Sequence, residues 1–403
     1  MTRNRAIALM AFIITISIII YPEASFRASL NGLKLWFEIV LPALLPFFAM
    51  ADILMGLGAV HFIGALLEPI MRPVFRIPGV GGFAVAMGLA AGYPMGAKIT
   101  GELHRRQLCS AAEAERLVSF ANTADPLFIV GAVSIGMFGL PDLGATLVLS
   151  HYIAAIIVGF CMRFHQGEES VQIKRSSGYF SRALRELDEA RRQDGRSFGL
   201  LFGESVRDTF TAMLFIGGCI MMFSVLIEVL TVSGLMGYIT NILSPVLRFA
   251  GMDPSLSVAV VNGFFETTIG AQSASVSSAS LVQKAMAASF VIGWSGLSVH
   301  TQVTAMLHGT EIRLLPYLTA RLLHGVLAAA CTAILLGPAK NLPTLVTKAV
   351  PALSGSSPAA SGFGNRLLAS TQWASMTALG LLGIGAIIWI ARRIIYIPFK
   401  NRR

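Results

Sequence analysis

Charged residues are scarce in this sequence. Only 13% of the 403 residues are Asp, Glu, Lys or Arg, whereas soluble domains carry about 25%. Hydrophobic residues make up 55%, and several apolar runs reach the roughly 20 residues that a helix needs to cross a bilayer. These runs are continuous and do not alternate with a period of two, which favours helices over strands. The sequence therefore predicts an all-α polytopic membrane protein that lies in the lipid bilayer.

Cysteines and catalytic motifs are scarce as well. The chain has 4 cysteines, and none lies at a CxxC or Cys/His spacing, so we expect neither a metal site nor a disulfide. No GxSxG, P-loop or HExxH motif is present. A hydrolase hypothesis would rest on Ser295 and His300 alone, and both lie in apolar segments. We predict that the protein is not an enzyme and uses no cofactor.

The basic residues that are present cluster in short loops and at the chain ends. The net charge is +10, which in a soluble protein would suggest a nucleic-acid partner. In a membrane protein this clustering is typical of the cytoplasmic side, so we exclude nucleic acid as a partner. Arg3, Arg5 and the basic tail predict cytoplasmic N- and C-termini. The motif Tyr21-Pro22-Glu23 is not a small-residue cleavage site, so we expect the first apolar run to be an uncleaved helix.

Two long segments of the chain carry similar landmarks in the same order. Each has an amphipathic stretch ending in Arg, then a glycine-marked apolar segment ending in Gly-Ala, then a polar insertion in an apolar helix. We interpret them as two related repeats. The predicted plan is an N-terminal transmembrane helix and connector (1–29), a first gate-type repeat (30–163), a basic cytoplasmic loop (164–204), a second gate-type repeat (205–338), and a linker with a C-terminal transmembrane helix (339–403).

Charge predicts opposite orientations for the two repeats. The stretch 98–116 carries four basic residues and is expected inside, whereas its counterpart 272–283 has no Lys or Arg and is expected outside. Residues 79–97 would then enter and leave on one face as a re-entrant hairpin. The predicted fold thus has two inverted-topology repeats with re-entrant hairpins and broken helices, a pattern that indicates a secondary-transporter site.

The first candidate element of that site is a glycine-rich stretch. Gly88, Gly92 and Gly96 recur every four residues and share one helical face, which permits close backbone approach. Pro94 lacks an N–H and frees a carbonyl at membrane depth. Tight packing at a kinked helix would explain the same pattern. The site hypothesis assigns hinge roles to Gly92, Pro94 and Gly96, and substrate contacts to Tyr93 and Lys98.

The second candidate element is the polar insertion Asn122-Thr123-Ala124-Asp125-Pro126. An Asp in an apolar segment is costly and usually faces a pathway, and Pro126 would break the helix directly after it. We assign substrate contacts to Asn122 and Thr123, a coupling or gating role to Asp125, and a hinge role to Pro126. The alternative is that Asn122 or Asp125 caps a helix near the interface.

Two further elements lie in the second repeat. Glu266 follows two phenylalanines and would couple or gate transport unless it pairs with a basic residue. His300 lies in a segment interrupted by glycines, although a buried histidine is often a satisfied core residue. The substrate contacts expected here are Thr267, Ser295, Ser298, His300 and Gln302, with Gly270 and Gly296 as hinges.

Several motifs of the chain match one known family. The opening motifs Tyr21-Pro22-Glu23 and 32–36, the run 41–48, and the later motifs 92–98, 126–129 and 298–302 resemble the YlbJ-type sporulation integral membrane proteins. The two halves resemble the nucleoside-recognition or gate domain, which is related to concentrative nucleoside transporters. That resemblance implies paired re-entrant hairpins and broken helices around a substrate.

The family resemblance also implies a function, namely moving dipicolinate from the mother cell across the outer forespore membrane. A planar aromatic dianion needs hydrogen-bond donors and positive potential, which half-helix N-termini supply. Asp125 and Glu266 would repel a dianion, so we expect them to couple transport to H⁺ or Na⁺. The alternatives are a transporter of nucleosides or another small solute, and a non-transporting scaffold for spore assembly. The partners considered include a second copy of the chain, as a homo-oligomer.

Overall fold

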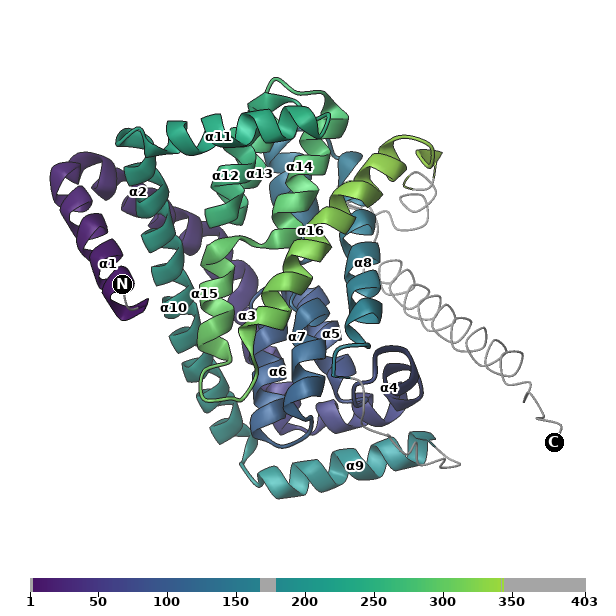
Figure 1. Ribbon diagram of the computed structural model, residues 1–403. Coiled ribbons are helices and arrows are strands. Elements are labelled where there is room, and N and C mark those ends of the chain that lie inside the picture. The colour runs from purple at the N-terminus through teal and green to yellow at the C-terminus, as the bar shows by residue number, and fades with distance from the viewer. Residues whose placement is uncertain (1–2, 167–178, 342, 344–403) are drawn as a thin grey trace, which may run out of the picture.

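The described part of the chain is helical and contains no strand (Figure 1). The structure is a computed structural model that describes residues 3–166, 179–341 and 343. The helix expected near the C-terminus and the first part of the basic loop lie outside these residues. The prediction of an all-α architecture is confirmed.

The chain opens with two helices that meet at a sharp bend. Helix α1 (Arg3–Ile20) and helix α2 (Pro22–Leu35) are bent by 106° at Tyr21. Pro22 occupies the first turn of α2, where no N–H is needed and its fixed φ suits a helix start. The connector expected between the first two spans is thus itself helical. A π-helical turn, η1 (Trp36–Val40), joins α2 to α3 (Leu41–Gly56).

The same series of elements then occurs twice: an apolar helix, an amphipathic helix, a short helical hairpin, a broken helix and a closing helix. The first series is α3, α4 (Ala59–Phe75), α5 (Gly81–Ala91) with α6 (Met95–Arg105), α7 (Ala111–Ala121) with η2 (Leu127–Met137), and α8 (Leu143–Met162). The second is α10 (Phe198–Val232), α11 (Leu235–Phe249), α12 (Ser257–Phe265) with α13 (Thr267–Val276), α14 (Leu281–Trp294) with α15 (Gly296–Met306), and α16 (Leu314–Leu336). The short helix η3 (Pro254–Leu256) precedes α12, and α9 (Tyr179–Asp194) lies between the two series.

The amphipathic helices and hairpins of the two series lie at opposite ends of the molecule. In Figure 1, α4, α5 and α6 lie at the lower end with α9, whereas α11, α12 and α13 lie at the upper end. An inverted repeat requires such a placement. The inverted orientation in the bilayer, with cytoplasmic termini, stays a prediction.

Several helices are suited to a membrane. Helices α8, α10 and α16 are long and apolar enough to cross a bilayer, and two bent helix pairs raise the described spans to as many as 5 if each pair is one span. Large apolar side chains are exposed on these helices, among them Leu214 at 63% and Ile156 at 60%. In water such exposure would be costly, but lipid accepts it. The protein is an integral membrane protein.

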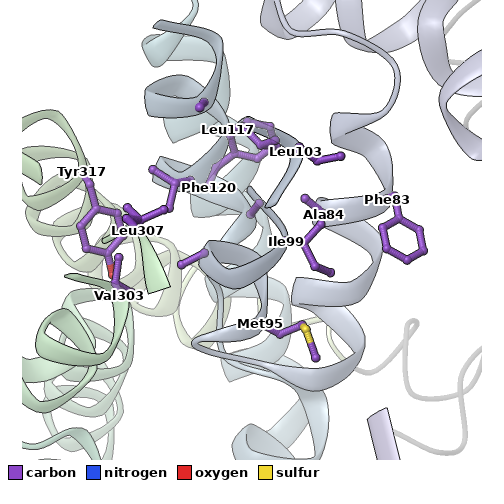
Figure 2. Packing of buried hydrophobic residues seen from close by; sticks show 14 of the residues in the cluster. Phe83, Ala84, Met95, Ile99, Leu103, Leu117, Phe120, Val303, Leu307 and Tyr317 are labelled. Carbon is purple, nitrogen blue, oxygen red and sulfur yellow. The ribbon is translucent and has the colours of Figure 1, made fainter. Parts of the chain in front are cut away.

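The largest buried core lies where the first hairpin meets the broken helix. Ala84, Ile99 and Leu117 lie between α5, α6 and α7, and Val303 and Leu307 reach this cluster from the second half (Figure 2). Glycine is required on the hairpin, because a Cβ at Gly96 would lie 2.2 Å from the carbonyl oxygen of Ala121. The close backbone approach predicted from the glycine spacing is therefore the contact between the hairpin and the end of α7.

Candidate functional site

Both hairpin tips, the first helix break and the helix that follows the second break border one cavity of about 780 Å³. Its wall is mostly apolar, with polar groups from six elements or the links between them. The lining residues that carry polar side chains are Glu38, Tyr93, Asp125, Glu266, Thr267, Thr268, Ser298 and Gln302. The cavity therefore collects residues from all four stretches that the sequence singled out.

In the first half, the hairpin tip packs directly on the helix break. Gly92 has a positive φ of 72°, and a Cβ there would lie 2.6 Å from Asp125 Oδ2. The Thr123 hydroxyl donates to the carbonyl of Gly88 at 3.3 Å. Asp125 Oδ1 accepts the backbone N–H of Phe128 at 2.9 Å, so this carboxylate caps the N-terminus of η2 from the cavity side.

The second half repeats this arrangement with different residues. Glu266 lies between α12 and α13, and its Oε2 accepts the backbone N–H of Ile269 at 2.8 Å. The Thr267 hydroxyl donates to the carbonyl of Ser295, which joins the hairpin to the break between α14 and α15. That break is made by two residues with positive φ, Ser295 at 78° and Gly296 at 74°. A Cβ at Gly296 would lie 3.0 Å from the Phe265 carbonyl oxygen, so a small residue is needed where the two elements meet.

A pair of buried histidines marks the place where the two halves meet. The rings of His151 of α8 and His324 of α16 lie with their centroids 4.4 Å apart and their planes tilted by 30°, and His324 Nε2 donates to the His151 carbonyl at 2.9 Å. They are 173 residues apart. The same separation relates Tyr93 to Glu266 and Asp125 to Ser298, and all four line the cavity. A two-fold relation between two copies brings equivalent residues into contact near its axis, so this contact is one that the predicted repeat requires, and the inverted repeat itself stays a prediction.

The predicted site residues divide into two groups. Tyr93, Asp125, Glu266, Thr267, Ser298 and Gln302 line the cavity. Apart from Lys98, the other predicted contacts lie behind its wall: Thr123 at the first break, where it donates to the hairpin, Ser295 at the second break, and Asn122 and His300 against one tyrosine. Asn122 Nδ2 donates to the Tyr317 hydroxyl at 3.0 Å, and His300 Nδ1 lies 3.4 Å from the same oxygen.

Lys98 was expected to bring positive charge to the substrate, but the structure places it elsewhere. Its Nζ lies 2.7 Å from Asp52 Oδ2 and 5.3 Å from the centroid of the Phe48 ring. Lys98 does not line the cavity. It joins the first hairpin to α3.

The predicted hinges lie at the tips and breaks. Gly92 and Pro94 form the first tip, where the Tyr93–Pro94 peptide is cis, and Pro126 starts η2. Gly96 packs on α7. In the second half, Gly296 forms part of the break. Gly270 lies in α13 and packs against Gly263, because a Cβ at Gly270 would lie 2.2 Å from the Gly263 Cα.

Three functional candidates were missed by sequence reasoning. Glu38 lies in the π-helical turn η1 and lines the cavity as a third carboxylate. Arg321 of α16 is fully buried, and His151 lies close to it. A signal existed for all three, because ionisable residues inside apolar segments are rare and usually functional.

The charge of the lining is one-sided. Glu38, Asp125 and Glu266 line the cavity, and no Lys, Arg or His is among the described residues that do so. No group of three or more His, Cys, Asp or Glu side chains in the described ranges could hold a metal ion. Hydroxyls, one amide and backbone N–H groups at helix ends are thus the donors that a ligand would meet.

A helical membrane protein with paired hairpins and paired broken helices around a mostly apolar cavity that holds a few polar groups belongs to the class of gate-domain proteins. The family model for nucleoside recognition, called Gate, matches residues 37–164 and 213–310. The chain is also 41% identical over 336 residues, 82% of each chain, to "Sporulation integral membrane protein YlbJ" of Bacillus subtilis (strain 168). The chain belongs to this family, as the sequence motifs indicated. No solved structure matches it.

Proposed function

We propose that the protein is a secondary transporter of a small organic solute, with dipicolinate as the substrate, exported from the mother cell across the outer forespore membrane during sporulation. The observation that carries the transport proposal is the cavity bordered by both hairpin tips, the first helix break and the helix that follows the second break. Discontinuous helices of this kind, in matching places of two repeats, are the usual build of a transporter site. The name of the Bacillus subtilis relative supports the sporulation setting.

The size and donors of the cavity suit a small solute. A volume of about 780 Å³ lies within the roughly 300–1,000 Å³ of small-molecule sites. Ser298 and Gln302 offer side-chain donors, and the Thr267 hydroxyl, which donates to Ser295, offers an acceptor. The N-termini of η2 and α13 add the positive ends of helix dipoles. A flat aromatic ring would lie against the apolar part of the wall.

The acidic lining implies that cations travel with an anionic solute. Glu38, Asp125 and Glu266 repel a dicarboxylate, and a carboxylate surrounded by apolar side chains is costly unless a proton or cation compensates it. We therefore assign H⁺ or Na⁺ coupling to Asp125 and Glu266, and substrate contacts to Tyr93, Thr267, Ser298 and Gln302.

A nucleoside is the second candidate substrate, and the acidic lining is the observation that favours it. A neutral ligand rich in hydroxyls can donate to Asp125 and Glu266 without charge repulsion. The family model is described by nucleoside recognition. This alternative keeps the same cavity and changes only its ligand.

Flux measurements on purified protein test the proposal. Proteoliposomes that contain the full chain should accumulate radiolabelled dipicolinate when an inward proton or sodium gradient is imposed, and excess uridine should not compete. Protein-free liposomes serve as the control. Competition by uridine, with uridine flux of its own, would establish the nucleoside alternative. Absence of flux for both solutes, in protein that is folded and correctly inserted, would favour the scaffold alternative.

A further inference from the structure

Arg321 is a fully buried cation without an acidic partner. Its relative exposure is 0%, and in the part of the chain that the structure describes it forms no ion pair. Nη1 donates to the carbonyl of Asn122 at 3.0 Å and lies 2.9 Å from His324 Nδ1, and Nη2 donates to the carbonyl of Ile292 at 3.4 Å. An arginine stays protonated in proteins, so a full positive charge lies in the interior.

Helix ends compensate this charge only in part. Asn122 is the C-cap of α7, and Ile292 lies in the last turn of α14. Both broken helices thus direct the negative ends of their dipoles at one guanidinium, and each end carries about half an elementary charge before screening. Two ring or guanidinium nitrogens of the cluster, Arg321 Nε and His151 Nδ1, have no hydrogen-bond partner among the described residues. A cation held by dipoles alone can still attract an anion.

Tyr93 separates Arg321 from the cavity. The Tyr93 side chain lines the cavity, and its hydroxyl donates to the carbonyl of Ile292 at 3.4 Å. Arg321 donates to that same carbonyl, so the guanidinium lies within two hydrogen-bond lengths of the cavity wall. Because Arg321 satisfies this carbonyl, the Tyr93 hydroxyl is free to turn and donate to a ligand in the cavity.

We propose that Arg321 is the cationic element of the substrate site: from behind Tyr93 it supplies the positive potential that lets a cavity lined by three carboxylates accept a carboxylate anion. The ligand class is a small aromatic carboxylate whose acid group accepts from Tyr93. This inference rests on the proposed function and names the residue that sets its selectivity for anions. It also replaces Lys98, which is paired with Asp52, as the source of positive charge.

The test compares ligands of the same shape and different charge. Isothermal titration on the full chain in nanodiscs at neutral pH would use dipicolinate, picolinate and the neutral diamide of dipicolinate. Wild-type protein should bind dipicolinate most tightly and the diamide most weakly. Arg321→Gln should weaken dipicolinate binding about 10- to 100-fold and change diamide binding by less than about threefold. Arg321→Lys keeps the charge and should retain the preference for dipicolinate.

A matched control separates charge from packing. Tyr317→Phe perturbs the same cluster by removing the acceptor of Asn122 without changing any charge, so it should shift all three affinities by one common factor. An equal loss for dipicolinate and diamide in Arg321→Gln would overturn the inference. If Arg321→Gln does not fold, the wild-type protein alone still tests the inference. Wild-type protein that binds the diamide as tightly as dipicolinate would overturn it. Wild-type protein that neither binds nor moves dipicolinate would instead refute the proposed function, and this inference with it.

Discussion

The two halves of the molecule carry their acids at different places on the same framework. In the first half the carboxylate is at the helix break, as Asp125, and the hairpin tip carries Tyr93. In the second half the hairpin tip carries Glu266, and Ser298 lies in the first turn of α15, directly after the break. Each acid accepts a backbone N–H three residues further on. Two exact copies of the first half would place both acids at the helix breaks, and two exact copies of the second half would place both at the hairpin tips. With one acid at a break and one at a tip, the negative charge is spread across the cavity.

The largest effect is expected where both halves depend on the same device, a glycine without space for a side chain. A Cβ at Gly96 would lie 2.2 Å from the Ala121 oxygen, and one at Gly270 would lie 2.2 Å from the Gly263 Cα. Both contacts involve backbone, which cannot yield. Gly96→Ala and Gly270→Ala should each destabilise the protein by about 3 kcal/mol or more, seen as loss of monodisperse protein in size-exclusion chromatography.

Gly218→Ala is the matched control for both glycine variants. Gly218 lies in α10, and a Cβ there would meet no heavy atom within 4 Å, so this variant should elute as wild type does. Normal folding of Gly96→Ala would show that the first hairpin is not seated as described.

The second-largest effect is expected for the two acids Asp125 and Glu266, and its size should differ between them. Glu266 is 6% exposed, whereas Asp125 is half-buried. Because solvent reaches Glu266 less, water and ions can compensate the loss of its carboxylate less easily. Glu266→Gln should reduce gradient-driven dipicolinate uptake by about tenfold or more and leave equilibrium affinity at saturating coupling ion within about threefold. Asp125→Asn should show the same pattern with a smaller loss.

The affinity measurement can contradict this division of roles. A large loss of dipicolinate affinity in Glu266→Gln at saturating coupling ion would make Glu266 a direct substrate contact. Equal uptake losses in both variants would mean that the two halves contribute their acids equally.

A third prediction concerns an ion pair that only the first half has. The position in the second half that corresponds to Lys98 is Ala271, which is fully buried. Lys98→Gln would leave Asp52 without its partner at 2.7 Å and should lower the free energy of unfolding by about 1–3 kcal/mol. Dipicolinate affinity should not change. The double variant Lys98→Gln with Asp52→Asn should recover the lost stability in thermal unfolding. A loss of dipicolinate affinity in Lys98→Gln without a loss of stability would mean that Lys98 does contact the substrate.

The smallest effects are expected at the positions equivalent to the acids. Tyr93→Phe and Ser298→Ala each remove one hydroxyl from the cavity wall and should weaken dipicolinate binding about two- to tenfold. The loss should be larger for Tyr93, because its hydroxyl lies between the ligand and Arg321. Titration of both variants side by side shows which loss of dipicolinate affinity is larger. A larger loss in Ser298→Ala would mean that the carboxylate of the ligand binds near Ser298 and not at Tyr93 of the first hairpin.

The fold could be predicted from the sequence to a large extent, because lipid makes local patterns decisive. Backbone groups in a bilayer must be satisfied within helices, so apolar length indicated the helices. Glycine, proline and polar insertions indicated where they break, as at Gly92 and Ser295. The first connector was the exception, since α2 continues the helical structure after Pro22.

The site was harder to predict, because contacts across the two halves depend on packing and not on spacing. Lys98 lies next to the first hairpin tip in sequence, yet it faces Asp52 on α3. Asn122 lies at the first break and His300 lies in α15 after the second, yet both turn to Tyr317 behind the wall. Arg321 and Glu38 each interrupt an apolar segment, and that signal would have found them had every charged residue in such a segment been considered.

Substrate protection of a single cysteine tests most directly whether the two halves share one binding chamber. Ser298→Cys would be made in a chain whose four cysteines are replaced by serine, with Thr301→Cys, an exposed position on the same helix, as the control. Dipicolinate should slow the reaction of a small membrane-permeant maleimide with the thiol at position 298 and leave position 301 unchanged. Equal labelling at position 298 with and without dipicolinate, in protein that still transports it, would contradict the shared chamber.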